Sequence, residues 1–93
     1  MTFIEIITLI SNTEPWSFTK EQNEAFVSLN NIRKKADGFI SFNANNGSTA
    51  QRTISITWDE KINRDNFKSI NQALYDAVDV AFANSSITLT RVN

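Results

Sequence analysis

The chain lacks the side chains that most often carry out chemistry. It contains neither histidine nor cysteine, which excludes the commonest general base, thiol nucleophiles, disulfides and the usual zinc ligands. Among the residue types that remain, Glu5 stands out because it interrupts the apolar run Phe3–Ile10. A carboxylate on a strand that lines a closed chamber could serve as a general base. The alternative is a structural carboxylate that pairs with Arg52, Arg91 or a group of a second subunit.

Three further side chains could complete a site around Glu5. Trp58 could shape a ligand pocket, and Asn43 or Arg52 could steady an oxyanion. An aromatic residue at the end of an inward-facing strand is more often part of the core, so packing is the alternative for Trp58. The candidate ligand-binding residues are therefore Glu5, Asn43, Arg52 and Trp58, and the candidates for catalysis are Glu5 and Trp58.

Other groups of conspicuous residues have simpler explanations. Trp16 and Phe18 lie in a turn-rich segment, where they could either pack over the first helix or form a recognition surface. Asp76 and Asp79 are three apart on the polar side of a predicted helix, and the cations of 33–35 complement a helix C-terminus. No phosphate loop, metal-ligand spacing or nucleophile elbow is present. We therefore expect no metal and no cofactor.

Length and composition indicate one small globular domain covering residues 1–93. The chain has 41% apolar and 20% charged residues and a net charge of −1, which excludes a disordered tail. Phe3–Ile10 is too short to span a bilayer and has no basic segment before it, so we expect a cytoplasmic protein without a membrane partner. The low pI of about 5.2 argues against a nucleic-acid partner.

Hydrophobic periodicity predicts the order β-α-β-β-α-β. Thr19 and Gln22 form a capping box for the first helix, which Asp37-Gly38 ends. Asn63 is expected to cap the second helix, with Ile62 stapled onto Phe67, and Asn84 follows its last turn. The buried stripe of that helix is predicted to include Phe67, Ile70, Leu74, Ala77, Val78 and Ala81. The predicted strands are 3–10, 39–44, 52–58 and 87–92.

This order predicts a ferredoxin-like α+β fold. Right-handed crossovers give a four-stranded antiparallel sheet with strand order 4-1-3-2 and both helices on one face. The first strand is apolar at both parities, as a central strand requires. Between the second and third strands, inward residues are all even-numbered, so facing pairs must sum to an even number and an odd-length loop is favoured.

The parity of each strand also predicts which side chains face the helices. We expect the helix-covered side to hold Ile40, Phe42, Ile54, Ile56, Trp58, Ile87 and Leu89. Because a carboxylate is costly in a core, Glu5 is assigned to the opposite, uncovered side of the sheet. The expected interface residues on that uncovered side are Phe3, Ile7, Leu9, Phe39, Ser41, Thr53, Ser55, Thr57, Thr88 and Thr90. A second copy is expected to cover this apolar and hydroxyl-rich surface, leaving a semi-polar chamber between subunits.

Two short motifs resemble those of antibiotic biosynthesis monooxygenase-like proteins. The segment 36–42, Ala-Asp-Gly-Phe-Ile-Ser-Phe, is similar to the glycine turn entering that family's second strand. The segment 54–60, followed by a helix holding Phe67, resembles its third-strand tryptophan junction. The resemblance implies a dimeric α+β barrel. Some members oxidise polyketides or break down haem with Asn, Trp, Arg or His, and of these only Trp58 has a counterpart here.

These features predict that the protein is a small homodimeric binding or assembly protein with an unidentified small-molecule ligand. The alternative is a cofactor-independent monooxygenase-like or isomerase-like enzyme acting on a small organic substrate in the chamber between subunits, with Glu5 abstracting a proton. A third hypothesis is an accessory protein that contacts a host or virion component through Trp16 and Phe18.

Overall fold

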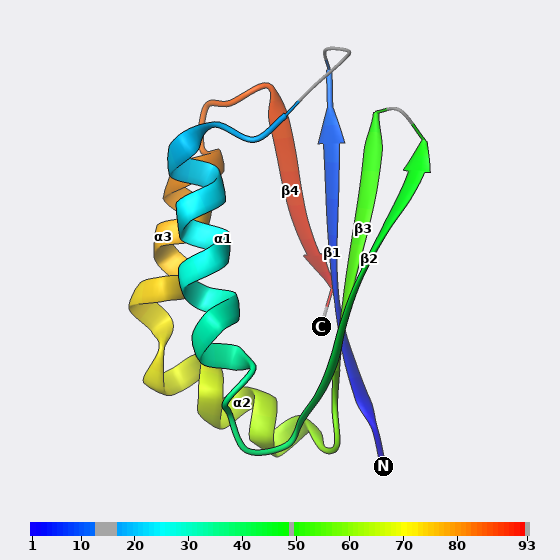
Figure 1. The fold of residues 1–93 in the computed structure, drawn as a ribbon, viewed down its shortest axis with the longest axis vertical. Helices are drawn as coiled ribbons and strands as arrows, with labels where there is room; N and C mark the ends of the chain where they lie inside the picture. Colours follow the sequence, from blue (N-terminus) through cyan, green and yellow to red (C-terminus); the bar gives the residue numbers. More distant parts are fainter. Residues whose placement is uncertain (13–16, 49, 93) are drawn as a thin grey trace.

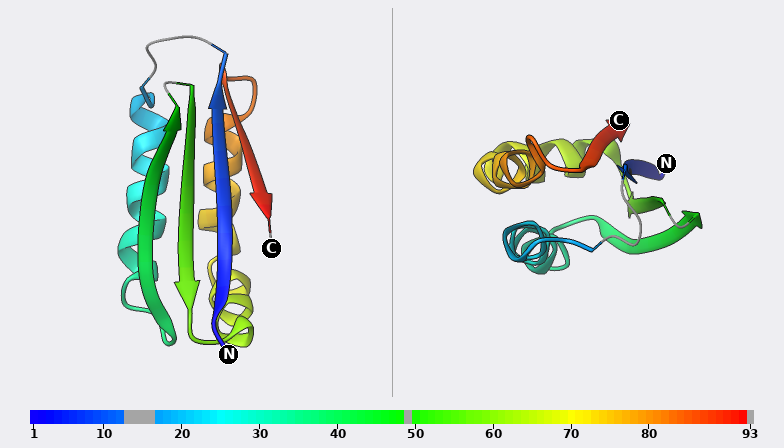
Figure 2. Two further views of the ribbon diagram at one scale, coloured as in Figure 1. Left: turned by 90° about the vertical axis from the view of Figure 1, so that its right-hand side faces the viewer. Right: turned by 90° about the horizontal axis from the view of Figure 1, so that it is seen from above.

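All four strands belong to one antiparallel sheet (Figure 1). The computed structural model describes residues 1–12, 17–48 and 50–92. The strands are β1 (Phe3–Ser11), β2 (Phe39–Ser48), β3 (Gln51–Trp58) and β4 (Ile87–Val92), in the spatial order β2-β3-β1-β4. The helices are α1 (Lys20–Arg33), α2 (Lys61–Ile70) and α3 (Gln72–Phe82). Figure 2 shows that all the helices cover the same face of the sheet. The predicted ferredoxin-like fold and strand order are confirmed.

The central strand β1 is turned over relative to the prediction. Ile7 and Leu9 are buried against the helices and Phe3 packs against the same core, so the assignment of these three residues to the uncovered face is wrong. The register explains the orientation, because Phe3 pairs with Trp58 and Ile7 pairs with Ile54, which places the odd residues of β1 beside the even residues of β3. Since β1 is apolar at both parities, only Glu5 distinguished its two faces, and its burial is compensated by partners described below.

A register shift near the start of β2 changes the predicted facing there. Phe39 pairs with Trp58 but Ser41 pairs with Thr57, so Ile40 is an extra residue, and it is exposed. Phe39 packs on the core with its ring 6.0 Å from that of Trp58. The predictions that Phe39 faces outward and Ile40 inward are therefore wrong. A bulge inserts one residue and so reverses the facing of what precedes it.

The β2–β3 hairpin is also tighter than expected. Phe42 pairs with Ile56, which confirms that facing pairs sum to an even number. The strands continue to Ser48 and Gln51, and a second register shift lies between Asn46 and Ser48. The parity of the strands is thus restored by a bulge within β2 rather than by an odd-length loop.

The core lies between the sheet and the helices. Its buried apolar members come from every strand except β2 and from every helix, and include Leu9, Leu29, Ile56, Trp58 and Val78. At one end, Phe18 packs against Phe26 and Phe82, with ring centroids 5.5 and 5.7 Å away. Phe18 is therefore part of the subunit interior, which argues against its use as an outward contact. Trp16 lies outside the described residues.

The first helix begins as predicted. Thr19 Oγ1 accepts from the Gln22 amide at 3.2 Å, and Gln22 Oε1 accepts from the Thr19 amide at 2.9 Å. The buried Gln22 side chain also donates to the Ala81 carbonyl of α3 at 3.2 Å. The predicted capping box thus satisfies the helix start and ties α1 to α3.

The predicted second helix is divided into α2 and α3. At the break, the Phe67 carbonyl accepts both from the Asn71 backbone amide and from the Asn71 side chain, each at 3.0 Å. The change of axis leaves Ile70 82% exposed, so its place in the buried stripe is wrong. Asn63 is not the cap, because α2 begins at Lys61 after Glu60, and Ile62 is exposed.

The face of the sheet turned away from the helices, here called the open face, is rich in isoleucine and hydroxyl groups. Ladder pairs such as Ile4 with Thr57 and Ile6 with Val92 place these side chains together. The predicted positions of the serine and threonine residues of β2, β3 and β4 on this face are consistent with the register. The open face consists of Ile4, Ile6, Thr8, Ile10, Ser41, Asn43, Asn45, Gln51, Thr53, Ser55, Thr57, Thr88, Thr90 and Val92.

Within the described ranges, no helix has the length and apolar character needed to cross a membrane.

Candidate functional site

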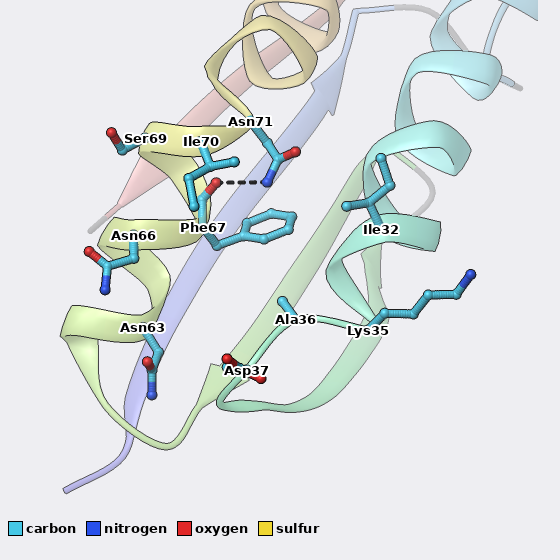
Figure 3. Close-up of a pocket in the computed structure, with 10 residues that line it drawn as sticks. All are labelled: Ile32, Lys35, Ala36, Asp37, Asn63, Asn66, Phe67, Ser69, Ile70 and Asn71. Carbon is cyan, nitrogen blue, oxygen red and sulfur yellow. Dashed lines mark hydrogen bonds between the residues drawn. The ribbon is translucent and has the colours of Figure 1, made fainter.

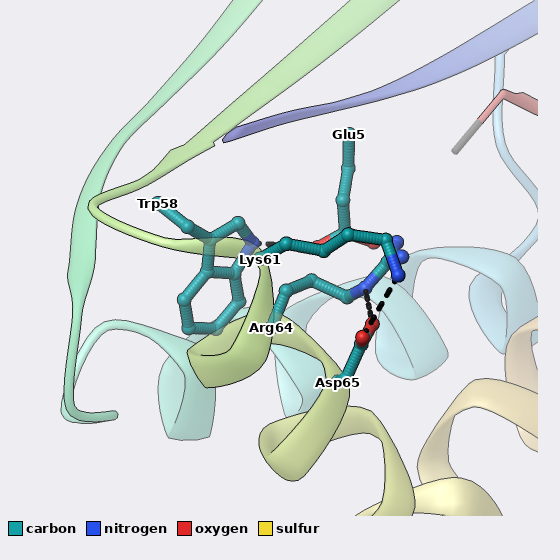
Figure 4. A network of polar contacts seen from close by, with 5 residues as sticks. All are labelled: Glu5, Trp58, Lys61, Arg64 and Asp65. Carbon is teal, nitrogen blue, oxygen red and sulfur yellow. Dashed lines mark hydrogen bonds and ion pairs between the residues drawn. The ribbon is translucent and has the colours of Figure 1, made fainter. Parts of the chain in front are cut away.

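Glu5 lies at the centre of a buried polar network beneath α2 (Figure 4). The indole Nε1 of Trp58 donates a hydrogen bond to Glu5 Oε1 at 2.7 Å. The guanidinium of Arg64 lies 3.4 Å from the other carboxylate oxygen, Oε2. Since Glu5, Trp58 and Arg64 are all buried, the carboxylate has exchanged water for one charged and one neutral donor. This arrangement offsets the cost of burying a charge.

Strand register and the start of α2 position these three side chains. Trp58 ends β3 and pairs with Phe3, so Glu5, two residues further on, points to the same side of the sheet. The chain then turns into α2, where Arg64 follows within the first turns. The Arg64 guanidinium lies 4.6 Å from the centre of the Phe3 ring, which covers the network at the end of the sheet.

Asp65 connects the network to the surface. Its carboxylate accepts from Arg64 Nε at 2.9 Å and from Lys61 Nζ at 2.9 Å. These hydrogen bonds, the one from Lys61 first, lower the pKa of Asp65 below its usual value. Arg64 is thereby shared between an interior and a surface carboxylate.

A second group of polar side chains adjoins this network in the core. Arg33 is only 1% exposed and its guanidinium carbon lies 6.0 Å from the Phe67 ring and 5.9 Å from the Tyr75 ring. Within the part of the chain that the structure describes, Arg33 Nε and the Tyr75 hydroxyl have no hydrogen-bond partner. Burial, and then the charge of Glu5, raise the pKa of Tyr75, and Arg33 opposes that shift. The phenol is therefore held in its neutral form.

The predicted site residues do not all come together. Glu5 and Trp58 are in direct contact, but Asn43 lies on the open face opposite Ser55. Arg52 pairs with Leu9 towards the other end of β1, with its guanidinium 5.5 Å from the Phe18 ring. Because Glu5 is on the helix-covered side, it cannot project into a chamber formed over the open face. That part of the catalytic hypothesis is wrong.

Arg64 is the functional partner that sequence reasoning missed. Arg52 and Arg91 were considered as partners of Glu5, yet Arg64 forms the ion pair. A usable signal was present, because Arg64 falls one helical turn before the buried Phe67 and on the same face of α2. A cation at such a position is directed at the core and needs a buried anion.

A groove opens on the surface between α1 and α2 (Figure 3). It has a volume of about 630 Å³, which is in the range of small-molecule sites. Figure 3 shows the Phe67 ring directed from α2 towards Ile32 of α1. Amide side chains make up much of the polar lining of the groove. The groove therefore offers both apolar contacts and hydrogen-bonding groups. The lining residues are Ile32, Lys35, Ala36, Asp37, Asn63, Asn66, Phe67, Ser69, Ile70 and Asn71.

The described residues contain no group of three or more acidic side chains arranged to hold a metal ion.

Comparison with known proteins identifies the fold. No protein-family model matches the chain, and no curated protein matches it in sequence. Solved structures do match over almost its whole length. SnoaB, a cofactor-independent oxygenase from Streptomyces nogalater, aligns with a TM-score of 0.64 at 8% identity, covering 99% of this chain and 91% of its own.

Two other solved structures also match the chain over almost its whole length. A Nitrosomonas europaea protein assigned as an antibiotic biosynthesis monooxygenase has a TM-score of 0.63 at 11% identity, covering 99% of this chain and 88% of its own. A dimeric ferredoxin-like protein of unknown function from Jannaschia has a TM-score of 0.58 at 13% identity, and the alignment covers 98% of this chain and 99% of its own. The structural neighbours are therefore antibiotic biosynthesis monooxygenase-like and dimeric ferredoxin-like proteins, as the two sequence motifs implied.

Proposed function

We propose that the protein is a homodimeric binding or assembly module whose subunits pack through the open face of the sheet. The observation that carries this proposal is the composition of that face. Ile4, Ile6 and Ile10 form a stripe along the central strand β1, and threonine and serine residues flank it on β3 and β4. None of the described residues on the open face is charged. A large uncharged sheet surface of this kind is typical of an interface.

A second copy of the chain suits this surface better than an unrelated partner. In a two-fold interface, a side chain near the axis meets its own counterpart, so a charge there would face a like charge. The open face avoids that repulsion. Its isoleucines can pack against each other, and its hydroxyl groups both donate and accept hydrogen bonds, so they can pair with identical groups. The likeness to a dimeric ferredoxin-like protein also supports a second copy of the chain as the partner of this face.

The helices also carry exposed apolar residues, but these lie on helices that carry charged residues as well. Val27 and Val80 lie on helices that carry Lys20, Glu24 and Asp79. Scattered apolar residues among charges are ordinary surface. This contrast supplies a matched control, because Ile10 on the open face and Val27 on α1 are both 47% exposed.

Sedimentation velocity on the purified chain tests the proposal. We expect a dimer at micromolar concentration, and we expect Ile10→Lys to produce monomers because it buries a charge opposite its own copy. Val27→Lys introduces the same charge at equal exposure and should leave the dimer intact. Circular dichroism of each variant checks that the sheet still forms. A wild-type monomer at these concentrations, or equal dissociation of both variants, would contradict the proposal.

The ligand of this module is proposed to bind in the groove between α1 and α2. Dimerisation through the open face leaves the groove free, since it lies on the opposite side of the sheet. Its mixture of apolar and amide side chains suits a small organic molecule. A cytoplasmic location belongs to the same proposal.

Oxygenase-type chemistry is the second candidate, favoured by the likeness to a cofactor-independent oxygenase. Such a site would have to lie inside each subunit, near Glu5 and Trp58. There the side chains of Arg64, Phe67 and Tyr75 fill the space beneath α2. Oxygen uptake measured with a panel of small aromatic substrates tests this candidate. Uptake that Glu5→Gln and Trp58→Phe abolish would replace binding with catalysis as the function.

A further inference from the structure

A small cavity opens beside the buried network, between α2 and the end of the sheet. Its volume is about 30 Å³, enough for one small group of a few atoms. The polar part of its lining is Glu5, Arg64, Lys68 and Arg91, and three apolar residues of β1 and β4 complete it. Three of its four ionisable residues are thus cations.

The cations of this region outnumber the carboxylates that neutralise them. Arg64 is paired with Glu5 and Asp65, and Arg91 is paired with Asp79. Lys68 has no carboxylate within ion-pair distance among the residues that the structure describes. The buried Arg33 nearby likewise has no described carboxylate partner. Two positive charges therefore remain without a counterion among the described residues, Arg33 being buried and Lys68 half-buried, and burying an unpaired charge is costly.

The same cations gather around one aromatic ring. Lys68 Nζ lies 5.5 Å and the Arg91 guanidinium carbon 5.6 Å from the centre of the Tyr75 ring, on which Arg33 also packs. The face of an aromatic ring attracts cations but cannot accept a conventional charged hydrogen bond. In addition, the Nε of Arg91 is buried and has no hydrogen-bond partner among the described residues. The cavity therefore adjoins an unused donor as well as unneutralised charge.

Glu5 does not serve as that missing acceptor. It is the single carboxylate of the described lining, and both of its oxygens are already engaged, Oε1 by Trp58 and Oε2 by Arg64. A group entering the cavity would instead contact the donors of Lys68 and Arg91. A monoanion fits the charge, the donors and the volume together.

We propose that this cavity binds one small monoanion, of the size of chloride or of a single carboxylate group, held by Lys68 and Arg91 with Arg64 behind them. The anion neutralises the surplus positive charge at the junction of α2, β1 and β4. Its lining belongs to one subunit, and two of its apolar members, Ile6 and Val92, are also part of the open face.

The site predicts that stability depends on the identity of the anion at constant ionic strength. Thermal unfolding is measured while sodium methanesulfonate, which is too bulky for the cavity, is replaced stepwise by sodium formate or sodium chloride. A site half filled at about 20 mM would shift the folding equilibrium about tenfold at about 200 mM. For a domain of this size that shift raises Tm by about 5 to 10 °C.

Matched lysine variants locate the effect. Lys68→Gln should abolish the anion-dependent rise in Tm, whereas Lys34→Gln, an exposed lysine at the end of α1 with the same loss of charge, should retain it. A larger response to formate than to chloride would assign carboxylate chemistry to the site. If Lys68→Gln does not fold, saturable broadening of the ¹³C-formate NMR line by the wild-type protein tests binding directly.

Three results would overturn the proposal. These are a wild-type Tm that does not depend on which anion is present, an equal anion response in Lys68→Gln, and a formate line that stays sharp in the presence of the protein. The first and third would mean that no anion occupies the cavity, and the second that the anion effect arises at another place in the protein.

Discussion

The Glu5–Arg64 pair connects the sheet to α2 through two buried charges. Each partner compensates the burial of the other, so neither can be removed without consequence. The two are not equivalent, however. Arg64 also binds Asp65 at the surface, whereas Glu5 would keep only the indole of Trp58 as a described partner.

We predict an asymmetric effect of breaking this pair. Arg64→Met leaves a buried carboxylate without its cation and should lower the free energy of unfolding by about 3–5 kcal/mol. Glu5→Gln leaves Arg64 paired with Asp65, and should cost about 1–2 kcal/mol. Urea unfolding of both single variants and of the double variant measures the coupling between the two positions. Equal small costs that simply add in the double variant would show that the ion pair contributes nothing to stability.

At the level of single residues, sequence reasoning identified the unusual side chain but not its surroundings. Glu5 and Trp58 were both selected, and the structure places them in contact. The ion-pair partner of Glu5 and the side of the sheet on which Glu5 lies were both predicted wrongly, for the same reason. An unpaired buried carboxylate is costly in a core, but Arg64 lowers that cost for Glu5. Whether a long side chain reaches an interior charge depends on the start and tilt of α2, which residue types alone do not specify.

Among the connections between elements, the turn that leads from α1 into β2 is the most constrained. Gly38 has a φ of +84°, which residues with a side chain adopt only at a cost. Its carbonyl accepts from the Asp59 amide at 2.8 Å, so the turn is pressed against the junction between β3 and α2. A Cβ at Gly38 would lie 2.3 Å from Asp59 Oδ1 and 2.7 Å from Asn63 Cβ.

Gly38→Ala is therefore predicted to destabilise the protein by about 2–3 kcal/mol, through left-handed strain and crowding together. Gly47→Ala is the matched control, because a Cβ there has nothing within 4 Å. The control should change the unfolding free energy by no more than about 0.5 kcal/mol. Urea titrations of the two variants measure the difference. A Gly38→Ala variant as stable as wild type would mean that the turn can move away from Asp59.

Element boundaries were predictable where a local rule sets them. The Thr19–Gln22 box predicted the start of α1 because both of its hydrogen bonds are made within four residues. The break between α2 and α3 was not predicted, since the apolar spacing of 67–81 continues across it. At that break the side chain of Asn71 bonds back to the Phe67 carbonyl, a local contact that apolar spacing does not reveal. The bulges of β2 were missed in the same way, because an inserted residue leaves composition and period almost unchanged.

For the molecule as a whole, strand order followed from the sequence but the identity of the exposed face did not. A strand with two apolar faces must be central, and β1 is. The same two-sided character makes either orientation of β1 acceptable. The open face therefore carries the even-numbered isoleucines of β1, whereas the odd-numbered apolar residues of that strand were expected there. The composition of the uncovered surface, apolar residues flanked by hydroxyl groups, is the same in both arrangements.

The proposed assembly predicts a stability that depends on concentration. Because folding of a dimer is coupled to association, Tm should rise with protein concentration. Differential scanning calorimetry over a hundredfold range of concentration measures this dependence, and Ile10→Lys should remove it. A Tm that does not vary over that range in the wild-type protein would indicate a subunit that is stable alone.

The distribution of charge has one more consequence. All the described charged side chains lie on the helix layer, the loops or the interior, and the open face carries none. A separated subunit is therefore amphipathic, with an uncharged face that carries an isoleucine stripe and an opposite layer that carries the charges. Such a particle should collect at air–water boundaries and on weakly hydrophobic chromatography media, whereas the paired form should pass through.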